Sequence, residues 1–166
     1  MRRPLLVVLT GALIALTACI PTDVPGLRWP ACRVVWYDAT VPAGTGSPMA
    51  AYVEELERAT GMDFVPSSKA AASDRGLLIT TLTNAPSHVG ARTSRVWGED
   101  LKLSKVMIAV RPGTSAGLRR HELGHVFNLL HNERSAVMRK APDPNGRWTN
   151  AELSAMRSFA RSSGCR

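Results

Sequence analysis

The chain has 166 residues and a formal net charge of +8, because 21 lysines and arginines outnumber 13 aspartates and glutamates. This length suffices for one domain with its own core and is too short for two. A basic surface would favour anionic envelope polymers or acidic protein substrates, although arginines scattered in this way more often have no such role. Only 5% of the residues are aromatic and no dense basic run occurs, so nucleic-acid binding is not expected.

The first 18 residues have the order of an export signal: two arginines, an apolar run at residues 5–17, and then small residues. The run is interrupted and is shorter than the roughly 20 apolar residues of a membrane-spanning helix, so a transmembrane anchor is the less favoured alternative. Residues 16–19, LTAC, resemble the lipobox of bacterial lipoproteins, whose cysteine becomes the lipidated first residue. The resemblance implies that Cys19 anchors the exported protein at the outer face of a membrane, unless clipping releases it.

Residues 20–30 contain three prolines and one glycine, so residues 19–30 are expected to form an extended tether. Such a tether would hold the folded domain, residues 31–166, away from a membrane surface. Two further cysteines, Cys32 and Cys165, lie near the two ends of this domain. In the disulfide-permissive compartment that an export signal implies, they are expected to pair and to tie the first strand to the C-terminal tail.

The first half of the domain has the pattern of strand, helix and strand. The β-forming run at residues 33–37 predicts a strand. Ser47 followed by Pro48 predicts a helix start, because serine is a favoured N-cap and proline fits the first helical position. Apolar residues then recur at near-helical spacing up to Gly61. A short strand near residues 63–65 and a polar loop are expected to follow.

Three more strands and two helices are expected in the second half. Residues 77–82 and 106–110 are apolar strand candidates, and residues 89–97 fit an edge strand because they alternate unevenly and include a glycine. One helix should begin near residues 114–115. The last helix opens with a capping box, TNAE, at residues 149–152. The order of elements predicts an α+β fold in which helices pack on a mixed, twisted sheet.

The sequence HELGHVFNLLH at residues 121–131 holds three of the four histidines of the chain. On a helix, His121 and His125 project from one face one turn apart, so both imidazoles can reach one cation. Glu122 lies beside the first of them and can reach a water on that cation. This is the HExxH pattern of zinc hydrolases, in which the glutamate acts as general base.

A catalytic zinc site normally has three protein ligands, and His131 is the natural third. On a continuous helix His131 would lie about 15 Å along the axis from His121, beyond reach of the same ion. The helix is therefore expected to end and turn back between His125 and His131. Asn128 is expected to make that turn, because asparagine follows glycine in its preference for positive φ. Coincidental spacing is the alternative, and the scarcity of histidine argues against it.

These residues resemble the metzincin metalloproteases, whose signature is HExxHxxGxxH followed by a methionine turn. The resemblance implies a small catalytic domain with one zinc ion bound by His121, His125 and His131, with Glu122 as the general base. Asn128 stands where the family has glycine.

Residues 135–138, SAVM, follow at the distance that is typical of matrixin-like members, so Met138 resembles the methionine that floors the zinc site. Matrixins often continue with Tyr-Pro, whereas this chain continues with Arg139 and Lys140, so the wall of the specificity pocket is expected to differ. Matrixins commonly bind calcium, but no calcium loop is recognised here, so that cofactor stays open.

The leading hypothesis is a zinc-dependent endopeptidase, monomeric, that acts on protein or peptide substrates; the edge strand at residues 89–97 would pair with an extended peptide. The alternatives are a catalytically silent, zinc-containing lipoprotein that binds at the cell surface, and a metallohydrolase of non-protein envelope amides.

Cys32 could instead be a zinc-blocking thiol, but no pro-domain is seen before it. His88 is expected to be solvated rather than a structural zinc ligand. Glu99 and Asp100 are expected to face solvent rather than to bind a cation.

Overall fold

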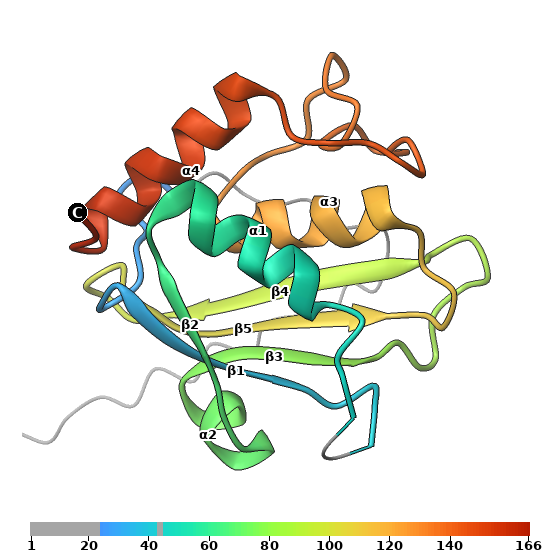
Figure 1. Cartoon of the computed structure of the whole chain (residues 1–166), viewed down its shortest axis with the longest axis horizontal. Coiled ribbons are helices and arrows are strands. Elements are labelled where there is room, and N and C mark those ends of the chain that lie inside the picture. Colours follow the sequence, from blue (N-terminus) through green and yellow to red (C-terminus); the bar gives the residue numbers. More distant parts are fainter. Residues whose placement is uncertain (1–23, 43–44) are drawn as a thin grey trace, which may run out of the picture.

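The protein is described here by a computed structural model that covers residues 24–42 and 45–166. These residues form a sheet with helices on both faces (Figure 1). In chain order the elements are β1 (Arg33–Asp38), α1 (Ala50–Thr60), β2 (Asp63–Pro66), α2 (Lys69–Asp74), β3 (Gly76–Thr81), β4 (Ala91–Trp97), β5 (Leu103–Val110), α3 (Ala116–Val126) and α4 (Asn150–Ser162). The fold is therefore α+β, as the sequence predicts.

The sheet has five strands in the order β2-β1-β3-β5-β4. Four of them run parallel, and β4 alone pairs antiparallel, with β5. The expectation of a mixed sheet with residues 89–97 at an edge is thus confirmed, because β4 lies at the end of the strand order. The side of β4 that faces away from β5 pairs with no other strand in the part of the chain that the structure describes.

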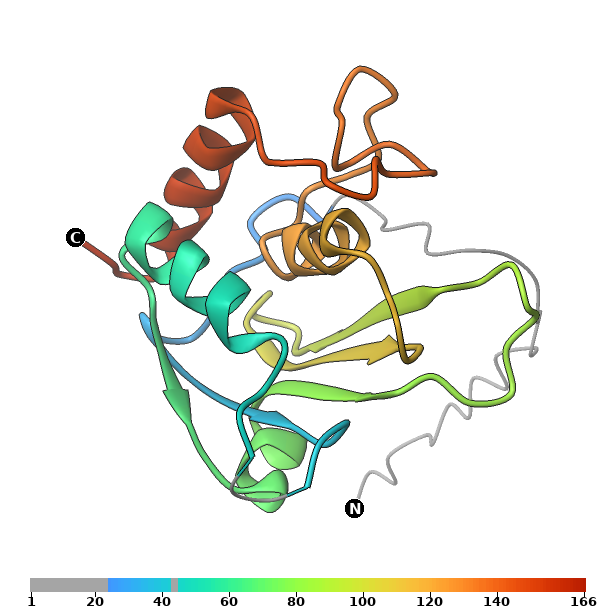
Figure 2. The same ribbon diagram turned by 45° about the vertical axis from the view of Figure 1, so that its right-hand side comes forward.

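The helices divide unequally between the two faces of the sheet. α1, α3 and α4 lie on one side and α2 lies on the other, as the two views show (Figures 1 and 2). The core fills the space between the sheet and the larger group of helices, and includes Leu56 of α1, Ile108 of β5, Leu123 of α3 and Met156 of α4, all fully buried. α3 is thus held between α1 and the β4–β5 edge of the sheet.

Two local expectations fail in the first half of the domain. α1 begins at Ala50, and Ser47 does not cap it, because the hydroxyl of Ser47 donates to the buried carboxylate of Asp38 and accepts from the backbone N–H of Met49. The expected polar loop contains α2, whose N-cap Ser68 accepts from the backbone N–H of Ala71 at 3.2 Å. In both places a hydrogen bond decides the local structure.

Residues 24–30 of the expected tether are packed on the domain, with Arg28 in a β-bridge to Lys102. Leu27 and Trp29 are each only 3% exposed, and the backbone of Arg28 bonds to Leu101 and Leu103 at 3.1 and 2.8 Å. Burial of a leucine and a tryptophan holds this proline-containing segment on the domain. The expected export signal, residues 1–18, and the lipidation site Cys19 lie outside the described residues. Within those that are described, none of the helices has the length and apolar character needed to cross a membrane.

Cys32 and Cys165 form a disulfide, with their Cα atoms 5.0 Å apart across a sequence separation of 133 residues. The expected pairing is confirmed, and the alternative role of Cys32 as a zinc-blocking thiol is wrong because its sulfur is already bonded. The bridge joins the start of β1 to the chain just after α4. It therefore closes the domain at the end of the sheet where its first strand and last helix meet.

Removal of this bridge is expected to lower the free energy of unfolding by about 4 to 5 kcal/mol, because a loop of this length restricts the unfolded chain strongly. Urea unfolding of Cys32→Ser, Cys165→Ser and the double variant would measure the loss. All three should lose the same amount, since each breaks the same bond. A loss below about 1 kcal/mol in the double variant would show that the bridge does not restrain the unfolded chain.

Candidate metal centre

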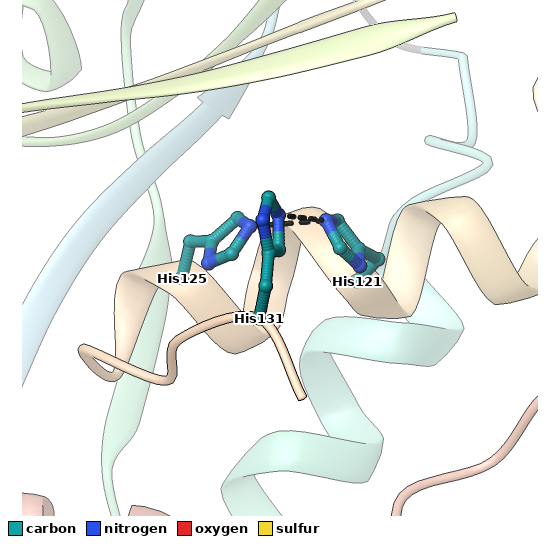
Figure 3. Close-up of side chains that lie close together, drawn as sticks. All are labelled: His121, His125 and His131. Atoms are coloured by element: carbon teal, nitrogen blue, oxygen red, sulfur yellow. Dashed lines mark hydrogen bonds between the residues drawn. The ribbon is translucent and has the colours of Figure 1, made fainter. Parts of the chain in front are cut away.

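Three imidazoles meet where α3 ends and the chain turns back (Figure 3). His121 and His125 lie on α3, and His131 lies on the loop that follows. The Nε2 atom of His121 is 3.0 Å from that of His125 and 3.2 Å from that of His131. Nitrogens bonded at 2.0–2.1 Å to one tetrahedral ion would lie about 3.3 Å apart. The observed spacing therefore fits three ligands of a single ion.

The backbone fixes the orientation of two of these rings. Nδ1 of His121 donates to the carbonyl of Val137 at 2.7 Å, and Nδ1 of His125 donates to the carbonyl of Leu129 at 2.7 Å. A carbonyl can only accept, so Nδ1 carries the proton and Nε2 presents its lone pair to the centre. Partners of this kind hold metal-ligating histidines in the correct tautomer.

Burial keeps the three rings neutral. It lowers the pKa of His121 below its usual value and lowers the pKa of His125 to about 3. Burial, followed by the positive charge of Lys140, also lowers the pKa of His131. A ligand imidazole must be neutral, so near pH 7 no proton has to be displaced before a metal ion binds. Such a donor set suits zinc, copper, iron or nickel.

The helix exit depends on Asn128, which has a φ of 60°. There the chain leaves α3 and reverses, and the N–H of Leu129 donates back to the carbonyl of Gly124 at 3.2 Å. The side chain of Asn128 also joins two other segments: its oxygen accepts from Arg95 of β4, and its amide donates to the carbonyl of Val24 at 3.3 Å. Asparagine therefore supplies the turn and two tertiary contacts that glycine would lack.

Two glycines allow other parts of the chain to approach α3 closely. A Cβ at Gly124 would lie 2.5 Å from the sulfur of Met138, and a Cβ at Gly117 would lie 1.7 Å from the carbonyl oxygen of Asp143. Met138 is 1% exposed, and its thioether packs against α3 at Gly124, the residue before His125. Both contacts place the segment after His131 directly against α3.

A hydrogen-bond network links α4 to His121. The hydroxyl of Ser135 donates to the carboxylate of Glu152, which also forms the capping box of α4. The same hydroxyl accepts from the N–H groups of Val137 and Met138 at 3.0 and 2.7 Å. Since Val137 also accepts from His121, α4 holds the loop that orients this ring. The sequence indicates Glu152 only as a capping residue.

Glu122 lies beside the histidines and is 2% exposed. Burial raises the pKa of its carboxyl group to about 7, against the opposing effect of a hydrogen bond from Thr93. That bond joins the hydroxyl of Thr93, on β4, to Oε2 of Glu122 at 2.6 Å. Thr93 lies in the predicted edge strand, but nothing in the sequence marks it as a partner of Glu122.

A cleft of about 360 Å³ opens beside this cluster. It is lined by His88, Val89, Gly90, Ala91, Leu118, His121, Glu122, His131, Lys140, Ala141 and Pro142. His88 therefore lines the cleft without joining the three ligands. Glu99 and Asp100 are exposed on the turn after β4, where Asp100 forms an ion pair with Lys102 at 2.8 Å.

Substitution of Asn128 tests the helix exit. Asn128→Gly should keep metal affinity within about threefold and cost about 1 kcal/mol of unfolding free energy, because two side-chain hydrogen bonds are lost. Asn128→Val should lower metal affinity at least tenfold, since a β-branched residue resists positive φ and displaces His131. Zinc titration by calorimetry measures the affinity. Equal affinities of the valine and glycine variants would show that the turn does not set the position of His131.

His121, His125 and His131 are thus placed to hold one metal ion, with a buried carboxyl group and an open cleft beside it. No protein-family model matches the chain, and no curated protein matches it in sequence. The likeness to metzincins consequently rests on the residues of the centre itself.

Proposed function

We propose that the protein is a zinc-dependent endopeptidase of the matrixin-like metzincin type. The observation that carries this proposal is that the Nε2 atoms of His125 and His131 lie 3.0 and 3.2 Å from that of His121, close to the ligand spacing of a tetrahedral ion, next to a buried carboxyl group that lines a cleft. Three protein ligands leave a fourth position for water, as catalytic zinc requires. Met138 beneath the helix adds a second feature of the same family.

Zinc bound by the three histidines would polarise a scissile carbonyl and make water acidic near neutral pH. The carboxylate of Glu122 takes the proton from the attacking water and passes it to the nitrogen that leaves. Burial raises the pKa of this carboxyl group to about 7 in the metal-free protein, and a zinc ion beside it would lower that pKa and favour the carboxylate that accepts the proton. Thr93 holds one oxygen of this carboxylate, which limits rotation of the group.

The substrate we propose is an extended protein or peptide segment, which pairs with the outer edge of β4. Strand addition satisfies backbone groups of both chains. β4 is suited to this because it ends the sheet and because its residue Thr93 contacts Glu122, so a strand added there passes beside the metal centre.

We propose further that the enzyme is exported and held at a membrane through a lipidated Cys19. The disulfide between Cys32 and Cys165 supports export, since such bonds persist in oxidising compartments. The docked segment at residues 24–30 would then keep the domain close to the membrane, in place of the long tether that the sequence predicts.

Glu122→Gln should abolish hydrolysis, with kcat/KM falling at least a hundredfold, while zinc stays bound at one ion per chain. Cleavage of a proteome-derived peptide library measures the first and metal analysis the second. Glu54→Gln, an exposed acid of α1 away from the centre, is the matched control and should keep full activity. Zinc bound with no cleavage by the wild-type protein would instead favour a catalytically silent binding protein.

A further inference from the structure

The cleft beside the metal centre has one uncompensated charge. Its lining includes Lys140, and the only acidic residue there is Glu122, which is buried and hydrogen-bonded to Thr93. In the part of the chain that the structure describes, Lys140 forms no ion pair. Its neighbour Arg139, by contrast, pairs with Asp143. The cleft therefore keeps a lysine ammonium group without a fixed partner.

The charge of Lys140 acts close to the reaction centre. Lys140 and His131 line the same cleft, so the ammonium lies on the side of the centre where a substrate would enter. Lys140 itself is exposed and can move its head group without disturbing the core. A negative group that enters the cleft can therefore contact the ammonium of Lys140 while it lies beside His121 and His131.

The remaining walls are apolar. Val89, Ala91, Leu118, Ala141 and Pro142 line the cleft together with the charged and imidazole groups. The volume of about 360 Å³ corresponds to roughly ten waters, which leaves room for one long side chain and bridging water. Apolar walls with a few placed polar groups are typical of sites that select a ligand by its end group.

From this arrangement we infer that the cleft takes the side chain of an acidic residue, glutamate before aspartate, next to the bond that is cleaved. The methylenes of glutamate pack against the apolar walls and its carboxylate pairs with Lys140, with the imidazole of His88 as a further donor. This inference rests on the proposed function and names its substrate class: acidic protein segments.

The first arm of the test measures cleavage of matched peptides with Glu, Gln or Lys at each position that flanks the scissile bond. At low salt, kcat/KM for the preferred position should be about threefold higher with Glu than with Gln and about tenfold higher than with Lys. Lys140→Glu should reverse the preference between Glu and Lys. Lys69→Glu makes the same charge change on α2, across the sheet, and should leave the preference unchanged.

The dependence on salt distinguishes a preference that arises from charge from one that arises from the shape of the cleft. The preference for Glu over Gln should shrink at high ionic strength, because an exposed ion pair is screened. A preference for aliphatic side chains that persists in Lys140→Glu would overturn the inference. So would a preference for Glu that both the salt and the Lys140→Glu substitution leave unchanged.

The second arm measures binding of the same peptides to zinc-loaded Glu122→Gln protein by fluorescence anisotropy, so that it does not depend on turnover. Tighter binding of the Glu peptide, lost when Lys140→Glu is added, would support the inference that the cleft binds an acidic side chain. If that result came with no cleavage by any variant, the proposed peptidase activity would be rejected and the inference about the cleft would stand. Equal affinities for the Glu, Gln and Lys peptides would reject the inference, whether or not the wild-type enzyme cleaves them.

Discussion

The close approach of three imidazole Nε2 atoms is the constraint on which the rest of this structure depends. The Nε2 atom of His121 lies 3.0 Å from that of His125 and 3.2 Å from that of His131 in a mostly buried position, and the protons of His121 and His125 point away to backbone carbonyls, so that their Nε2 lone pairs face each other. Lone pairs brought so close are stabilised by a cation between them and by little else. The carbonyls and the buried loops that hold the rings in place therefore make sense as the support of a metal site.

That support comes from segments far apart in the chain. Arg120, next to His121, pairs with Glu55 of α1 at 3.1 Å and so ties α3 to α1. Asn128 joins the helix exit to β4 and to the segment at residues 24–30, and Ser135 joins the loop that carries Met138 to α4. Displacement of any one of these segments would move a ligand. Several distant segments of the domain thus hold the three histidines in position.

The sequence predicted those features that depend on residues close together in the chain. Helical periodicity placed His121 and His125 on one face, the preference of asparagine for positive φ indicated the turn at Asn128, and β-forming runs located most strands. Contacts between distant residues left no such signal. Ser47 bonds to Asp38 and leaves its helix uncapped, Thr93 meets Glu122 from another element, and α2 is a six-residue helix with one buried alanine, too short for a visible period. The docking of residues 24–30 was missed because the three prolines and one glycine of residues 20–30 indicated an extended segment.

Zinc-edge X-ray absorption on protein loaded with one equivalent of zinc tests the central claim most directly. We predict a four-coordinate ion with three imidazole nitrogens and one oxygen at about 2.0–2.1 Å. Replacement of His131 by alanine should remove one imidazole from the spectrum. A spectrum with sulfur ligands, or with an all-oxygen shell of loosely bound zinc, would contradict the assignment of these three histidines as the metal centre.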